Sequence, residues 1–181
     1  MELRYNKKTM LQLSGVLINR PILSLRTGTT VGTALQPIIN PNNLKIEGFY
    51  CEDRFNKKKS CILLYQDIRD VMKQGLVVND HDALTDPEEV VRLQEIMKLQ
   101  FELIGKPVVT DSKSKLGKVS DFATEIETMY IQKIYVNQPL HKSFIGGSLS
   151  VDRSQIIEIT SRRIIINDPA QPTVARAAAT A

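Results

Sequence analysis

The chain has 181 residues, of which 42% are hydrophobic and 24% charged, a composition typical of one large or two small globular domains. Its net charge of +4 is unevenly spread, with two mildly basic ends around an acidic stretch at residues 81–102, and is too weak to demand a nucleic-acid partner. We expect neither a transmembrane segment, because no apolar run approaches the ~20 residues that cross a bilayer, nor a secretory signal, and the cysteine pattern favours the cytosol.

Short apolar runs separated by turn residues predict many strands in the first eighty residues. Pro21 precedes one run and suits the start of an edge strand, because proline cannot donate a ladder hydrogen bond. Gly32 lies at a turn exit, where a positive φ or a close backbone approach is expected. The predicted strands lie at 21–25, 31–39, 44–52, 60–65 and 75–79, and residues 67–75 are predicted to form a short helix or helical turn.

The strongest helix signal lies in the acidic stretch. The N-cap, the first helical position and the capping-box position carry the expected residue types, in Thr85 or Asp86, Pro87 and Glu88. Apolar residues then recur at spacings of three and four, at Val90, Leu93, Met97 and Phe101. We therefore predict an amphipathic helix at 86–100, within a linker at 81–102, whose apolar stripe docks on a small β-barrel.

The segment that starts at Leu103 repeats the one that starts at Leu17. "LINRPILSLRTGTTVGTAL" aligns with "LIGKPVVTDSKSKLGKVSDF", so that a Leu-Ile pair, a basic residue with a proline, and a turn-exit glycine coincide. Gly117 is the counterpart of Gly32. "GLVVND" at 75–80 likewise matches "RIIIND" at 163–168. The spacing of about 86 residues indicates an internal duplication.

The second repeat is also predicted to be β-structured. Its strands are expected at 107–110, 117–126, 129–136, 148–151, 156–160 and 163–167. Many short strands with turns between them indicate a small barrel or sandwich, and closing the sheet would remove exposed edges. The Ala/Pro-rich tail at 169–181 is predicted to be disordered.

Four segments of the second repeat resemble the PRC-barrel domain: "LIGKPVVTDSKSKLGKVSDF", "MYIQKIYV", "SLSVDRSQIIEI" and "RRIIIND". Residues 103–168 follow the family pattern well. The first repeat follows it more loosely, because Asn19 replaces the first glycine and "DIRDV" stands for "DRSQI". The resemblance implies a mainly β chain with two small PRC-barrel-like β-barrels, at 10–80 and 103–168, joined by the amphipathic helix.

The same resemblance implies a role. Barrels of this family act as assembly and docking domains, and the tandem arrangement is similar to two-barrel adaptor proteins associated with archaeal cell division. We therefore expect a cytoplasmic, non-enzymatic adaptor that binds a protein partner, reaches the membrane only through that partner, and is a candidate homo-oligomer. Because a ribosome-maturation factor carries a related barrel, RNA binding is the alternative, although the second domain of such a factor is not seen.

The residues offer little for catalysis. Histidine is the commonest general acid or base, and only His81 and His141 are present, both in polar loop-like segments. His81 lies between Asp80 and Asp82, but adjacent loop residues rarely complete a metal coordination sphere. No glycine-rich phosphate loop ends in G-K-[ST]. We expect no enzyme activity, no catalytic or metal-binding residue and no cofactor.

Two further features surround a predicted hairpin tip. Cys51 and Cys61 flank it and form either a regulatory disulfide or two small buried hydrophobic residues, of which a reducing compartment favours the second. The tip itself carries a basic cluster of candidate anion or partner contacts, Arg54, Phe55, Lys57, Lys58 and Lys59. This cluster is either a solvated loop or a phosphate contact with RNA or an anionic membrane. Three lysines contribute ~1 kcal/mol each at such a membrane, too little for stable anchoring.

Overall fold

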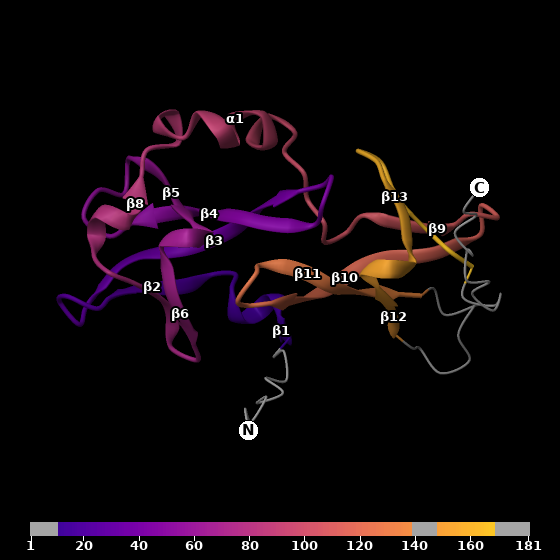
Figure 1. The fold of residues 1–181 in the computed structure, drawn as a ribbon, viewed down its shortest axis with the longest axis horizontal. Helices are drawn as coiled ribbons and strands as arrows, with labels where there is room; N and C mark the ends of the chain where they lie inside the picture. The colour runs from indigo at the N-terminus through magenta and orange to yellow at the C-terminus, as the bar shows by residue number, and fades with distance from the viewer. Residues whose placement is uncertain (1–10, 139–147, 169–181) are drawn as a thin grey trace, which may run out of the picture.

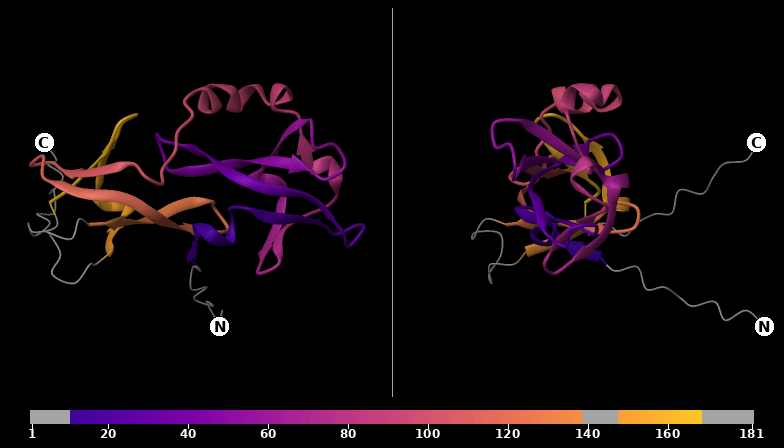
Figure 2. Two further views of the ribbon diagram at one scale, coloured as in Figure 1. Left: turned by 180° about the vertical axis from the view of Figure 1, so that it is seen from behind. Right: turned by 90° about the vertical axis from the view of Figure 1, so that its left-hand side faces the viewer.

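The computed structural model describes residues 11–138 and 148–168, which form a mainly β structure (Figure 1). The predictions for His141 and for the tail at 169–181 lie outside the described residues. No helix in the described part of the chain is long and apolar enough to cross a lipid bilayer. The two halves lie end to end along the long axis of the molecule (Figure 2).

The first half contains an antiparallel meander followed by two returning strands. The meander consists of β2 (Arg20–Ser24), β3 (Thr30–Asn40), β4 (Lys45–Asp53) and β5 (Ser60–Leu64). The returning strand β7 (Gly75–Val78) pairs in parallel with β2, and β6 (Ile68–Met72) pairs with β7. A short strand, β8 (Leu84–Thr85), covers part of β5.

The helical prediction for residues 67–75 is wrong. Only Tyr65–Asp67 forms a single 3₁₀ turn, and the residues that follow form β6. The partly buried Ile68 and Val71 are three positions apart, a spacing that arises from a β-bulge between Ile68 and Asp70. A bulge adds one residue to a strand and so turns a spacing of two into a spacing of three.

The second half has six strands at the predicted positions, with ends that differ by at most two residues. They are β9 (Pro107–Thr110), β10 (Lys115–Glu125), β11 (Tyr130–Asn137), β12 (Ser148–Asp152), β13 (Ile156–Ile159) and β14 (Ile164–Ile166). Strands β9 to β12 form a meander, β14 pairs in parallel with β9, and β13 pairs with β14. The strands of this half therefore pair in the same order as those of the first half.

Two strand pairings join the halves: β1 (Leu11–Leu13) pairs with β10, although it falls in the range predicted for the first barrel, and β4 pairs with β11. The second junction is nearly symmetric. The turn before β4 ends at Leu44 with φ of 52°, and the turn before β11 ends at Met129 with φ of 58°. The N–H of Ile46 donates to the carbonyl of Met129 at 2.8 Å, and the N–H of Ile131 donates to the carbonyl of Leu44 at 2.9 Å. Such a reciprocal pair of bonds has the form of a contact across a two-fold axis.

One hydrophobic core runs through both halves. Its largest fully buried side chains come from both halves of the chain. They include Phe49, Phe122, Ile22, Leu76, Ile131 and Ile164. The core is mainly aliphatic, as the low aromatic content of 6% predicts. The two halves therefore share the apolar surface whose burial stabilises the fold.

The sheet is open at both ends. Its hydrogen-bonded path runs from β13 to β6, and within residues 11–138 and 148–168 no ladder joins β6 to β5 or β13 to β12. Both end strands carry a bulge, which hinders pairing with a further chain. The structure thus shows one open mixed sheet rather than a closed one, and two separate barrels stay a prediction.

The single α-helix among the described residues is shorter than predicted. Asp86 accepts a hydrogen bond from the N–H of Glu88 at 3.0 Å and caps a 3₁₀ turn at Pro87–Glu89. Val90 then leaves the helical region, and α1 (Val91–Lys98) follows. The cap is therefore Asp86 and not Thr85, and the 86–100 prediction covers a turn, a break and a helix.

Helix α1 lies across the first half only. Val90 and Leu93 pack on Ile38, Ile62 and Leu64. In the second half, the strand positions that correspond to Ile62 and Leu64 hold Ser150 and Asp152, as their pairing with Tyr135 and Lys133 shows. These polar side chains give the apolar face of a helix no apolar surface to pack on, so α1 packs on the first half.

Candidate functional site

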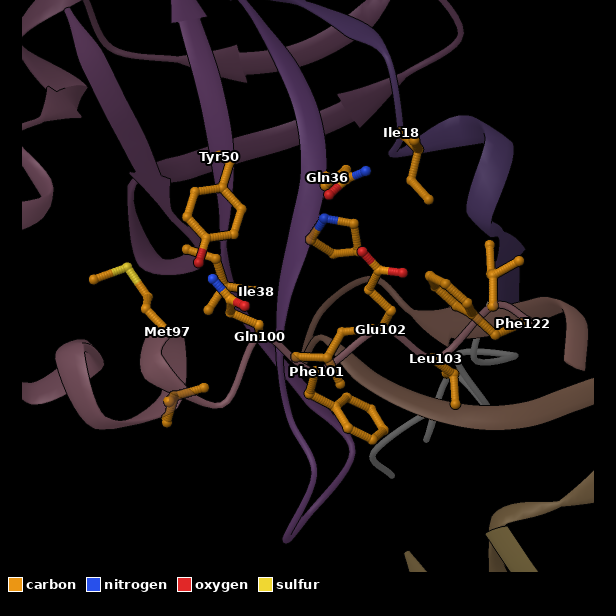
Figure 3. Close-up of a pocket in the computed structure, with 14 residues that line it drawn as sticks. Ile18, Gln36, Ile38, Tyr50, Met97, Gln100, Phe101, Glu102, Leu103 and Phe122 are labelled. Atoms are coloured by element: carbon orange, nitrogen blue, oxygen red, sulfur yellow. The ribbon is translucent and has the colours of Figure 1, made fainter. Parts of the chain in front are cut away.

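A groove of about 670 Å³ lies between β3 and the segment that leads from α1 to β9 (Figure 3). Sites that bind compact ligands have volumes of about 300–1,000 Å³. The walls of the groove are mostly apolar and include Ile38, Ile39, Met97, Phe101, Leu103 and Phe122. Side chains from both halves of the chain therefore meet in one concave surface.

Strand β3 forms one wall of the groove, because its neighbour on one edge ends before its neighbour on the other edge. Strand β4 pairs with β3 as far as Asn40, whereas β2 reaches only Ala34. The next residue, Leu35, accepts a hydrogen bond from the N–H of Asn19 at 3.3 Å. Beyond it, no strand in the described part of the chain pairs with the β2 side of residues 36–40. This stretch contains Pro37, a residue that sheets tolerate at an edge.

Residues 100–104 form the opposite wall. Gln100 has φ of 44° and turns the chain away from α1. Leu103 is buried in the core, and the Lys106 ammonium lies 4.6 Å from the centre of the Phe101 ring. Leu99 and Ile104 are 58% and 44% exposed. Ile104 lines the groove, so one large apolar side chain is presented to solvent next to an apolar concavity, and Leu99 is exposed nearby in the chain.

Few polar groups line the groove. Burial raises the pKa of the Tyr50 hydroxyl, which can act as a hydrogen-bond donor. Glu102 is the one charged residue among those that line the groove. Among the described residues, its carboxylate has no hydrogen bond or ion pair. The groove is thus apolar, with an acidic group at its margin.

The predicted basic cluster lies in the turn between β4 and β5. The Arg54 guanidinium donates to the carbonyl of Thr30 at 3.1 Å. Lys57 pairs with Glu52 at 3.7 Å, and Lys59 pairs with Asp86 at 3.4 Å. Lys58 has no ion pair within the residues that the structure describes. Carboxylates of the chain itself therefore offset much of the charge that the sequence displays at this tip.

Phe55, the remaining member of the cluster, lies against His81. The two rings are 5.1 Å apart in an edge-to-face arrangement. His81 Nε2 lies 3.0 Å from a carboxylate oxygen of the buried Asp53. Burial opposes ionisation of Asp53, but hydrogen bonds from the Phe55 N–H and from His81 outweigh it and lower the Asp53 pKa. The contact fixes the hairpin to the 3₁₀ turn at His81–Ala83.

The contact between His81 and Asp53 was missed by the sequence analysis, which placed His81 in a solvated loop. The two residues are 28 positions apart, and no local pattern pairs them. Across residues 11–138 and 148–168, no three His, Cys, Asp or Glu side chains come close enough together to hold a metal ion.

Cys51 and Cys61 lie directly opposite each other in β4 and β5. Both are free and buried. Burial raises the pKa of Cys61 to about 11, and it raises the pKa of Cys51 further. The thiols therefore stay protonated and behave as small hydrophobic side chains.

Comparison with known proteins adds no relative to this description. No protein-family model matches the chain, and no curated protein matches it either.

Proposed function

We propose that the chain is a non-enzymatic protein-interaction module whose docking surface is the groove between β3 and residues 100–104. The observation that carries this proposal is the apolar groove with Ile104 exposed among its lining residues. Exposed apolar surface that continues into a concave site is typical of protein-binding sites. The groove is lined by residues of both halves of the chain, so binding of a partner there requires both halves.

The proposal includes a tandem arrangement of two PRC-barrel-like units within the open sheet. It is supported by the same strand order in both halves and by the reciprocal hydrogen bonds between Ile46, Met129, Leu44 and Ile131. A cytoplasmic setting in cell-division or membrane-associated assembly rests on the family resemblance alone. A homo-oligomer is a further arrangement that such a duplicated unit permits.

The chemistry of the groove favours binding over catalysis. Acid–base sites usually pair titratable groups whose environments push their pKa values apart. Glu102 has no second carboxylate, histidine or cysteine beside it among the lining residues. The remaining lining groups are apolar side chains, amides and one phenol, which suit recognition.

RNA binding through the basic cluster is the alternative. It is less well supported, because Lys57 and Lys59 pair with Glu52 and Asp86. The cluster also exposes a single aromatic ring, Phe55, whereas single-stranded RNA is usually held by several stacked rings.

Affinity capture from native lysate with matched variants tests the proposal. Ile104→Glu places a charge on the groove rim, and Leu25→Glu makes the same change at a residue that is 63% exposed in another turn. We expect Ile104→Glu to abolish capture of a protein that the parent and Leu25→Glu retain.

Two results would contradict the adaptor proposal. Capture that survives Ile104→Glu would place the docking surface elsewhere. Capture that is lost after nuclease treatment, and after joint replacement of Lys57, Lys58 and Lys59 by glutamate, would instead support RNA binding with its steep salt dependence.

A further inference from the structure

Asn40 and Glu125 occupy equivalent positions in the two halves. Each ends a long strand of 11 residues and begins a turn. Asn40 accepts a hydrogen bond from the N–H of Leu44, and Glu125 accepts one from the N–H of Met129, both at 2.8 Å. Each also pairs with the first residue of the next strand. The last residues of β3 and β10 can therefore be compared one by one.

The edge of β10 at these positions is covered by an extended segment. Strand β1 (Leu11–Leu13) pairs antiparallel with it, Leu11 opposite Glu125 and Leu13 opposite Ala123. A 3₁₀ turn at Ser14–Val16 follows, and the Ser14 hydroxyl donates to the Asp121 carboxylate at 2.5 Å. A bulge between Ala123 and Thr124 does not prevent this pairing.

The equivalent edge of β3, at Ile38–Asn40, has no such strand in the described part of the chain. The position-by-position counterpart of β1 is residues 97–99, since Leu17 corresponds to Leu103. These residues instead form the end of α1 and its C-cap. The groove is the space beside this unpaired edge, with Met97 on one side and Phe101 on the other.

We propose that this edge of β3 accepts an extended segment of a partner protein, added antiparallel at Ile38–Asn40 as β1 is added to β10. This inference rests on the proposed function and specifies its mode. Apolar side chains at alternate positions suit the two apolar walls, since neighbouring residues of a strand point to opposite faces. A flanking basic residue suits Glu102, whose carboxylate no described residue pairs, and the acidic stretch at 81–102.

The two strands that end the path of the sheet are poorer acceptors. Strands β6 and β13 end the sheet, but each is interrupted by a bulge, and neither borders the groove. Strand addition gains affinity from main-chain hydrogen bonds and specificity from side-chain pockets. The edge at Ile38–Asn40 combines both requirements.

The probe is a fluorescein-labelled peptide, Lys-Leu-Gln-Leu-Ser-Lys, which places the β1 sequence and the Ser14 that follows it between two lysines. It is titrated into the full chain while fluorescence anisotropy is recorded. We expect saturable binding that Ile104→Glu abolishes and Leu25→Glu leaves unchanged. N-methylation of alternate backbone amides should weaken binding at least tenfold, because it removes main-chain donors. Amide hydrogen exchange of residues 36–40 should slow when the peptide binds.

Each contrary result has a distinct meaning. Absence of peptide binding, or binding that N-methylation leaves intact, overturns strand addition. If groove-dependent capture from lysate persists in that case, the adaptor proposal stands while the mode fails. Equal affinity for a peptide with glutamates in place of the lysines overturns the basic flank. If the chain forms a dimer and the peptide dissociates it, the occupant of the groove is a second copy of the chain and not a partner protein.

Discussion

At the scale of single residues, two glycines let neighbouring strands approach closely. Gly117 has φ of 149°, and a Cβ there would lie 1.9 Å from the carbonyl oxygen of Asn137. A Cβ on Gly32 would lie 2.7 Å from the carbonyl oxygen of Glu52. A positive φ or a close backbone approach is expected from the sequence at both glycines, and the structure confirms a close approach at each.

Gly117→Ala should therefore destabilise the fold strongly. We expect a loss of about 2–4 kcal/mol, because the methyl group clashes with backbone that cannot move away and the φ angle is strained. Gly15→Ala is the matched control, since nothing lies within 4 Å of its Cβ position. Urea denaturation measures both. A loss below about 0.5 kcal/mol, the usual size of surface effects, would show that the two strands are farther apart than described.

The depressed pKa of Asp53 predicts a dependence of stability on pH. Its ionised form is favoured in the folded state, so its contribution is present above the unfolded pKa of about 3.9 and is lost as pH falls through the lower folded pKa. The pKa values of Asp80 and Asp86 are also lowered, first by N–H donors from His81 and Glu88. The urea concentration at the midpoint of unfolding should therefore decrease as the pH is lowered from roughly 5 to 2.

Asp53→Asn isolates the contribution of this one carboxylate. The variant should be about 1–3 kcal/mol less stable near neutral pH, because His81 loses its charged partner, and its midpoint should fall less on acidification. Asp82→Asn, at an exposed neighbouring position, is the control. An unchanged acid response in Asp53→Asn would remove Asp53 from the account.

At the scale of elements, α1 is held by a small apolar cluster separate from the main core. Leu93 is 3% exposed, whereas Val91 is 73% exposed. Leu93→Ala should cost about 2–4 kcal/mol, as is usual for truncating a buried leucine, and Val91→Ala should cost less than about 0.5 kcal/mol. Urea denaturation provides the measurement. Equal effects of the two changes would contradict the packing of α1 on β3 and β5.

The positions of the strands were easier to predict than the strands with which each of them pairs. Alternating apolar residues and turn glycines located the main strands, because both signals are local. The bulge at Arg69 interrupts the alternation of β6, and β1 spans three residues, too few for a periodic signal. Its partner, β10, begins more than a hundred positions later. The groove was also beyond prediction, because it arises where α1, β3 and the second half meet.

At the scale of the whole molecule, the shared core predicts cooperative unfolding. Ile131 is fully buried beside the junction between β4 and β11. Ile131→Ala should lower the free energy of unfolding by about 2–5 kcal/mol in both halves together. Native-state hydrogen exchange reports on β3 and β10 separately. A loss of protection confined to β10 would show that the halves unfold independently.

Site-specific photocrosslinking in native lysate tests the docking surface most directly. A photoreactive side chain replaces Ile104 on the groove rim in one variant and the exposed Leu25 in another. The account predicts crosslinks from position 104 to an extended, apolar and basic segment of one protein, and none to that protein from position 25. Equal crosslinking from both positions, or crosslinks from position 104 to RNA, would contradict it.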